Sequence, residues 1–339
     1  MPKIPVQPFP VSVLFGVAKP SGPTSMHVVN QLKSLVFKSR LFVAQDKLEK
    51  AAEKNGKRRR REKDGLKIGQ GGTLDPLADG VLVVGVGRGT KRLNDFLDCS
   101  KEYRTTCLLG CETDTYDSEG ARVRTAPWRH ITREKVENAL SQFRGNIEQA
   151  PPIFSALKMD GMPLYEYARK GIPLPRPIEK RMVTIHSLEL VEWLGSDHTY
   201  RWPEKCFSED QKSALEKTLS SVDGAASLKD QTEPKDGDAD VPTAFVLKMK
   251  VSGGTYVRSI VHDLAHMLDS AGHVVTLTRS RQKNYVLTAE EEGDRQCVSW
   301  DVFERALKDE GDRDEDGWTE WEREVMRVYD VVDGAKSSS

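Results

Sequence analysis

The stretch from Gly71 to Val86 constrains the fold of this chain more than any other segment. Its two initial glycines permit a tight turn or positive φ angles, and Pro76 favours an extended backbone at Asp75. The apolar run that follows, from Val81 to Val86, predicts a buried strand. For an isolated Asp-Pro pair, a helix cap with a proline in the first turn is the more common explanation. The whole stretch instead predicts a single carboxylate on a stiff loop at the edge of a sheet.

The residues of this stretch also occur in an order that is typical of a known enzyme family. Residues 72–80 read Gly-Thr-Leu-Asp-Pro-Leu-Ala-Asp-Gly. This closely resembles the catalytic loop of the TruB family of pseudouridine synthases, whose pattern is Gly-(Thr/Ala)-Leu-Asp-Pro-Leu-Ala-x-Gly followed by a hydrophobic strand. The resemblance implies that Asp75 is the catalytic nucleophile.

Six further segments resemble motifs of the same family and follow one another in the family's order. They begin at Lys19, Lys101, Thr113, Pro151, Gly254 and His273. Without this context, Tyr103 is most simply a core aromatic residue and Arg258 a surface residue. The resemblance implies instead that Tyr103 lies on the flipped uracil and moves a proton at its C5 atom, and that Arg258 pairs with the catalytic carboxylate. It assigns five residues to substrate binding: Gln70, Tyr103, Tyr256, Leu277 and Lys19.

The segment around Arg258 also has a pattern of its own. Apolar and polar residues alternate from Phe245 to Val251, which predicts a half-exposed strand that runs on to Ile260. Because side chains in a strand repeat every two residues, Tyr256 and Arg258 are expected on one face. An arginine beside Asp75 would favour the ionised carboxylate.

The chain departs from the family at Gln70. Family members usually carry a histidine five positions before the catalytic aspartate, where it helps to eject the target base. Glutamine fills a similar volume and forms hydrogen bonds, but it lacks an aromatic ring that stacks on a base. We therefore expect an active enzyme in which base flipping is less favourable than with histidine.

A different hypothesis comes from His262 and His266, which are spaced to share one face of a helix, as in His-Glu-x-x-His zinc hydrolases. Asp263 replaces the glutamate that acts as general base there, and the sequence offers no evident third ligand. We therefore expect no metal. No cofactor is expected either, because an isomerisation balances within one substrate. The other alternative is a non-catalytic RNA-binding or tRNA-folding protein, which would lack the set of Asp75, Tyr103 and Arg258.

Charge is distributed unevenly along the chain, although the net charge of the 339 residues is only −1. Residues 33–67 carry 13 basic and 5 acidic side chains, including the run Lys57 to Arg61, which suits phosphate contact or nuclear import. Residues 204–240 and 290–316 carry net charges of −5 and −8. The five cysteines are odd in number and contain no Cys-x-x-Cys pair, so a reducing compartment fits best.

These observations predict one catalytic domain over residues 11–290, with a basic insertion at 39–67 and an acidic flexible insertion at 204–240. Residues 291–339 are expected to form an acidic, partly helical tail, with no convincing PUA domain. The family resemblance implies an α+β fold, a bent, mixed and mostly antiparallel sheet flanked by helices and loops.

The resemblance extends over roughly residues 13–287 and is greatest with the fungal or other eukaryotic branch. It implies a tRNA pseudouridine-55 synthase that acts on the TΨC stem-loop of tRNA, and it also allows an mRNA with a similar loop. We expect an intracellular monomer that is neither secreted nor bound to a membrane. The resemblance implies the nucleus and the mitochondrion as its locations.

Overall fold

The computed structural model describes residues 9–53, 66–155, 157–170, 172–219, 229–231, 241–309 and 311–332. The chain divides into two compact units, one of residues 1–101 with 279–339 and the other of residues 102–278. The basic run Lys57 to Arg61 lies outside the described residues. In the described ranges, no helix has both the length and the apolar character needed to cross a membrane.

The first unit is built on strand β1 (Val13–Lys19), the strand expected from the apolar N-terminal run. It pairs antiparallel with β3 (Asp79–Val86), the strand that follows Asp75. Shorter strands complete this part of the sheet: β2 (Ile68–Gln70) on β3, β15 (Val298–Ser299) and β16 (Asp330–Val331) on β1, and β13 (Tyr285–Val286) between β14 (Arg295–Gln296) and the end of β12 (Gly272–Gln282). The β1–β15 pair is parallel, so the sheet is mixed and mostly antiparallel, as predicted.

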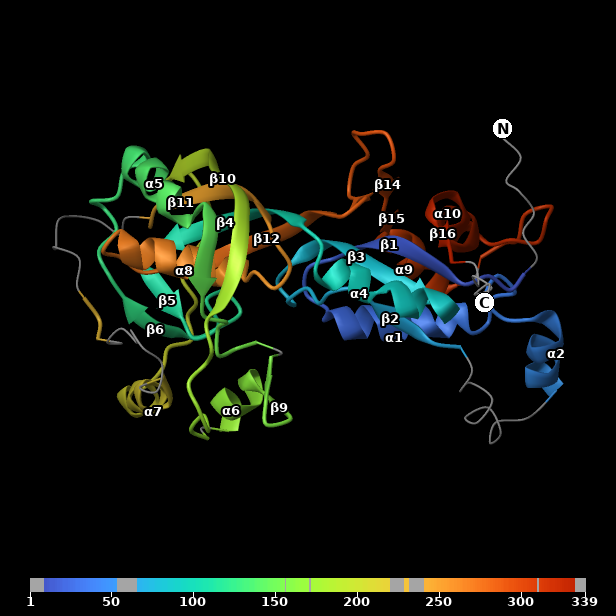
Figure 1. Ribbon diagram of the computed structural model, residues 1–339, viewed down its shortest axis with the longest axis horizontal. Coiled ribbons are helices and arrows are strands. Elements are labelled where there is room, and N and C mark those ends of the chain that lie inside the picture. The colour runs from blue at the N-terminus through green and yellow to red at the C-terminus, as the bar shows by residue number, and fades with distance from the viewer. Residues whose placement is uncertain are drawn as a thin grey trace, which may run out of the picture. The chain divides into compact units, whose positions relative to one another are not determined.

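Helix α1 (Ser25–Val36) begins where the sequence places it, because the Thr24 side chain accepts a hydrogen bond from the backbone N–H of His27. Its buried residues Val28, Leu32 and Val36 pack in the core of the first unit together with Phe15. The unit also contains α2 (Gln45–Glu53), a 3-10 helix (Gly87–Arg92), α4 (Asn94–Leu97), α9 (Trp300–Lys308) and α10 (Glu320–Val328) (Figure 1).

The C-terminal segment is more than an acidic tail with some helix. Its two helices lie where the sequence predicts them, but Phe303, Trp321 and Val325 are buried in the same core as Phe15 and Leu32. Strands β15 and β16 of this segment also pair with β1. The amphipathic pattern of the two helices explains this difference, because each buries an apolar face although the segment as a whole is acidic.

The second unit contains a run of neighbouring strands, β4 (Lys101–Leu109), β11 (Ala244–Val251), β10 (Arg181–Gly195) and β7 (Gly145–Gln149), with β12 on the other side of β4. Helices α5 (Arg133–Leu140), α6 (Leu164–Lys170), α7 (Glu209–Leu219) and α8 (Val257–Met267) accompany them, with a short 3-10 helix (Ser141–Phe143) after α5 (Figure 1). Two small hairpins, β5 (Cys111–Thr113) with β6 (Arg122–Thr125) and β8 (Lys158–Met159) with β9 (Met162–Pro163), complete the unit.

One expectation about the second unit is wrong. Strand β11 ends at Val251, and Tyr256 is the N-cap of α8, so Tyr256 and Arg258 are not on one strand face. Gly254 turns the chain with a φ of 79°, and the buried positions after it recur at helical spacing.

Within the predicted acidic insertion at 204–240, residues Glu209–Leu219 form helix α7. The flexibility of this insertion stays a prediction.

Candidate active site

Asp75 lies in the loop between β2 and β3, in the first unit, and is half-buried. The residue before it, Leu74, is fixed by Ser25 at the start of α1. The Ser25 hydroxyl donates to the Leu74 carbonyl at 2.9 Å and accepts from the Leu74 N–H at 2.8 Å. The carbonyl of Asp75 accepts from the N–H of Ala78 at 3.1 Å, which closes a turn over Pro76. The backbone that carries the carboxylate is therefore held on both sides.

Lys19, at the end of β1, is buried and contacts the backbone of the same loop. Its ammonium donates to the carbonyl of Ala78 at 2.6 Å, of Pro20 at 2.9 Å and of Pro76 at 3.4 Å. Burial lowers the pKa of Lys19 from 10.5 to about 8, and the negative charges of Asp79 and Asp75 oppose this shift. Lys19 thus contacts the loop backbone, whereas the family resemblance implied a role in binding substrate.

Two more buried side chains bind the other half of the loop. Arg279 donates to the carbonyls of Val81 at 2.8 Å and Gly72 at 2.9 Å, and Gln282 donates to the carbonyl of Gly71 at 2.6 Å. Gly80 approaches the backbone of Arg279 so closely that an added Cβ would lie 2.2 Å from its carbonyl oxygen. None of these contacts was evident from the sequence, since Arg279 and Gln282 lie about 200 residues away along the chain.

Gln70 folds back on the Asp75 loop. Its side-chain oxygen accepts from the N–H of Gly72 at 2.6 Å, and its amide nitrogen donates to the hydroxyl of Thr73 at 3.0 Å. The residue that replaces the family's histidine therefore supports the loop through two hydrogen bonds. A role of Gln70 in substrate binding stays a prediction.

In the second unit, Tyr256 and Arg258 are placed by the first turn of α8. Gln149, at the end of β7, clamps the backbone of Tyr256: its side chain accepts from the N–H at 2.8 Å and donates to the carbonyl at 3.0 Å. The buried guanidinium of Arg258 donates to the carbonyl of Thr115 at 2.6 Å and to that of Phe154 at 3.2 Å. Its Nε lies 3.8 Å from a carboxylate oxygen of Asp117. Nothing in the sequence pattern pointed to Gln149, which lies 107 residues before Tyr256.

The remaining predicted residues lie on two neighbouring strands of the second unit. Tyr103 is buried in β4, as the alternating pattern predicts, and Leu277 is buried in β12, which pairs with β4. The structure thus brings Lys19, Gln70 and Asp75 together in the first unit. Tyr103, Tyr256, Arg258 and Leu277 belong to the second unit.

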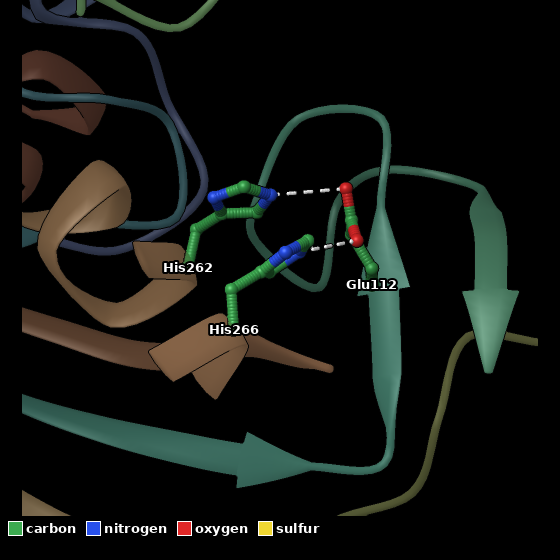
Figure 2. Close-up of side chains that lie close together, drawn as sticks. All are labelled: Glu112, His262 and His266. Atoms are coloured by element: carbon green, nitrogen blue, oxygen red, sulfur yellow. Dashed lines mark hydrogen bonds and ion pairs between the residues drawn. The ribbon is translucent and has the colours of Figure 1, made fainter. Parts of the chain in front are cut away.

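A separate polar cluster joins α8 to the β5–β6 hairpin. Figure 2 shows the rings of His262 and His266 pointing to the two oxygens of Glu112, at 3.0 and 2.9 Å. The Nε of Arg124, on β6, lies 3.1 Å from the same carboxylate, and His262 Nδ1 lies 2.9 Å from Asp263. Glu112, His262 and His266 form a group whose donor atoms lie within 4.8 Å of one another. Glu112 is thus a third group with a potential metal-binding atom, and the sequence did not reveal it.

The surroundings of this group favour an ionic cluster over a metal site. One terminal nitrogen of Arg124 lies 3.1 Å from His266 Nε2, so a guanidinium already faces the nitrogen that would bind a cation. Burial alone would raise the pKa of Glu112, but the two histidines hold it well below 4.5. Burial alone would lower the pKa of His262, but Glu112 and Asp263 raise it to about 9. A metal ion at this site would have to displace the proton of His262 and lie beside the guanidinium of Arg124.

Comparison with known proteins identifies the family. The sequence model described as TruB family pseudouridylate synthase, N-terminal domain, matches residues 57–207. The tRNA pseudouridine synthase 4 of Schizosaccharomyces pombe is 39% identical over 86% of this chain and 82% of its own length. The protein of the same name from Saccharomyces cerevisiae is 33% identical, over 96% and 88%. The tRNA pseudouridine synthase B of Aromatoleum aromaticum is 39% identical over 66% of this chain and 56% of its own length. The chain therefore belongs to the TruB family of pseudouridylate synthases.

Proposed function

We propose that this protein converts uridine to pseudouridine in tRNA, at position 55 in the TΨC arm. The observation that carries the proposal is the loop of Asp75, whose sequence matches the family's catalytic loop and whose backbone is held by Ser25, Lys19 and Arg279. Relatives that span most of the chain are named tRNA pseudouridine synthases, which supports tRNA as the substrate. An mRNA with a similar loop is a second substrate of the same chemistry.

The reaction is an isomerisation and begins with the target nucleotide out of its stack, because the glycosidic bond of a stacked uridine is not accessible. The bond from C1′ to N1 breaks and the base rotates. A bond from C1′ to C5 then forms, the proton on C5 leaves, and N1 gains a proton. Atoms and electrons balance within one RNA molecule, so the proposal requires no cofactor.

Asp75 is the residue that we place at C1′. In one route its carboxylate attacks C1′ and forms an ester that the C5 atom later displaces; in the other it removes a proton from the ribose and starts an elimination. Arg258 pairs with this carboxylate and keeps it ionised, and Tyr103 moves the proton at C5. Tyr256 and Leu277 line the uridine pocket in this proposal, as the family resemblance implies.

The contacts of the loop explain how Asp75 would be effective. A nucleophile held in position before the reaction avoids the entropic cost of ordering it in the transition state. The paired hydrogen bonds of Ser25 to Leu74 and the ammonium of Lys19 on the carbonyl of Ala78 limit backbone motion on both sides of Asp75. Lys19 therefore contributes to the reaction through the loop.

Tritium release from a tRNA transcript labelled at uridine C5 tests the proposal. The purified protein is expected to release one tritium per transcript, and to release none above background from a transcript with cytidine at position 55 and label elsewhere. Equal release from both transcripts would show a different target position, and no release from either would refute the activity. The nucleus and the mitochondrion as locations, a monomeric state and phosphate binding by Lys57 to Arg61 stay predictions.

A further inference from the structure

Helix α8 is fixed along one face by a short part of the β5–β6 hairpin, the segment 112–117. Arg258, His262 and His266 follow one another at intervals of four residues and so share a helix face. Arg258 donates to the carbonyl of Thr115. One turn later the ring of His262 stacks on Tyr116, with centroids 3.9 Å apart and planes inclined by 22°. Another turn on, His266 contacts Glu112. Three successive helical turns are therefore fixed to six consecutive residues.

The centre of this contact is ionic and balanced in charge. His262 lies between the carboxylates of Glu112 and Asp263, which raise its pKa to about 9 and so favour its protonated form at neutral pH. Glu112 also faces Arg124 of β6 and His266 of α8. Two positive side chains, His262 and Arg124, thus match two negative ones. The side chains of Glu112 and Arg124 are 6% and 7% exposed, so solvent screens their attraction only weakly.

We propose that Glu112 and His262 are positioning residues for the reaction, which hold α8 against segment 112–117 so that Arg258 keeps its orientation at the start of the helix. The inference rests on the proposed role of Arg258. A shift of about 1 Å in a catalytic group costs on the order of a hundredfold in rate. The residues that set the rotation of this helix therefore matter to turnover although they lie one and two turns away from Arg258.

The protonation of His262 gives the proposal a signature that a purely structural contact lacks. Its pKa is raised in the folded protein, from 6.5 to about 9. Its contribution to stability is therefore fully present below pH 6.5 and is lost as the pH rises through about 9. When the proton leaves, His262 can donate to only one of its two carboxylates. Above that pH α8 loses an ion pair to Glu112, and the rate is expected to fall.

The first test is His262→Phe, which keeps a ring to stack on Tyr116 and removes both ion pairs. The single-turnover rate on tRNA is expected to fall by about tenfold or more, while the Kd for tRNA stays that of the wild type. The fall in rate that we expect for the wild type near pH 9 should be absent from the variant. Any alkaline change that remains belongs to other groups, such as Lys19. The matched control is His186→Phe, at an exposed position of β10, which should behave as the wild type.

Glu112→Gln is the second variant, because it keeps the shape of the side chain and removes only its charge. Its single-turnover rate should also fall, while its Kd for tRNA stays that of the wild type. A folded His262→Phe or Glu112→Gln protein with the wild-type rate and pH profile would overturn the proposal. In the wild type, NMR of labelled histidine should show His262 titrating near 9, and a value near 6.5 would also overturn it. One zinc ion per chain that is lost in Glu112→Gln would show a metal site instead. The NMR titration and the zinc determination do not depend on pseudouridine formation. They therefore test the ionic cluster even if the proposed activity is wrong.

Discussion

Single residues hold the Asp75 loop from outside it, and Lys19 is one of them. Its ammonium has three carbonyl partners, two of them in the turn after Asp75. Removing a donor from a buried acceptor costs about 1–3 kcal/mol, because the acceptor then lacks both its protein partner and water. The loop therefore depends on a residue that is more than 50 positions away along the chain.

Lys19→Met should lower both the melting temperature and the single-turnover rate at neutral pH, because the methionine fills the space and donates no hydrogen bond. The unfolded chain binds the proton of Lys19 more tightly than the folded protein does, so its contribution to the free energy of unfolding rises between about pH 8 and 10.5. Denaturant unfolding at a series of pH values should show that the free energy of unfolding rises less steeply with pH in the variant than in the wild type. Lys91→Met, at an exposed position, is the control. A Lys19→Met protein with wild-type stability and rate would show that the loop holds its shape without this ammonium.

At the scale of elements, the start of β3 must pass directly beside the end of β12. Gly80 makes this possible, since it has a φ of 106° and no side chain toward Arg279. Gly22 has the same φ of 106° but no atom within 4 Å of an added Cβ. Alanine substitutions at the two glycines therefore allow the effect of backbone strain on stability to be distinguished from the effect of close packing.

Gly80→Ala should be far more destabilising than Gly22→Ala. Both substitutions place a side chain at positive φ, which costs on the order of 1–3 kcal/mol. Only at Gly80 does the new methyl also collide with the backbone of Arg279. Thermal unfolding of the two variants measures the difference. The rate of pseudouridine formation should also decline further in Gly80→Ala, because Arg279 supports the Asp75 loop. Equal melting temperatures would show that strain alone decides the cost.

The elements differ in how far the sequence predicts them. The period of apolar residues and a Thr cap were enough to predict β1, α1 and β4. The motif order singles out Asp75 as the nucleophile, and this assignment stays a prediction. The start of α8 was not predicted, because Thr255, Tyr256 and Val257 are typical strand residues and the helical spacing of buried residues after them is the weaker local signal. Glu112 and Gln149 could not be found, since their partners lie 150 and 107 residues away and no local pattern links them.

At the scale of the whole chain, the first unit contains both ends of the described sequence. Phe303 of α9 is fully buried, with its ring centroid 6.3 Å from those of Phe15 and Trp321. Removing the chain from Glu290 onward would expose the core around Phe15. We therefore expect such a truncation to unfold the first unit.

Phe303→Ala should lower the free energy of unfolding by about 3–5 kcal/mol, the usual cost of removing a buried phenylalanine from a core. Leu97→Ala, at a side chain that is 47% exposed, should have little effect. A second control is a chain that ends after Val332, which keeps every described residue of the segment. Urea unfolding of the three proteins gives the comparison. A cost for Phe303→Ala as small as that for Leu97→Ala would mean that the C-terminal segment is peripheral to the core.

The central claim is that the carboxylate of Asp75 carries the reaction. Asp75→Asn keeps the shape of the side chain and removes its charge, and Asp79→Asn makes the same change four residues later, where the carboxylate also acts on Lys19. The decisive measurement is single-turnover formation of pseudouridine at position 55 of an unmodified tRNA, with the Kd for that tRNA measured on the same preparations. Asp75→Asn is expected to form no pseudouridine and to bind tRNA as the wild type does, while Asp79→Asn stays active. A rate for Asp75→Asn within about tenfold of the wild type, equivalent to less than about 1.4 kcal/mol of barrier, would contradict the account.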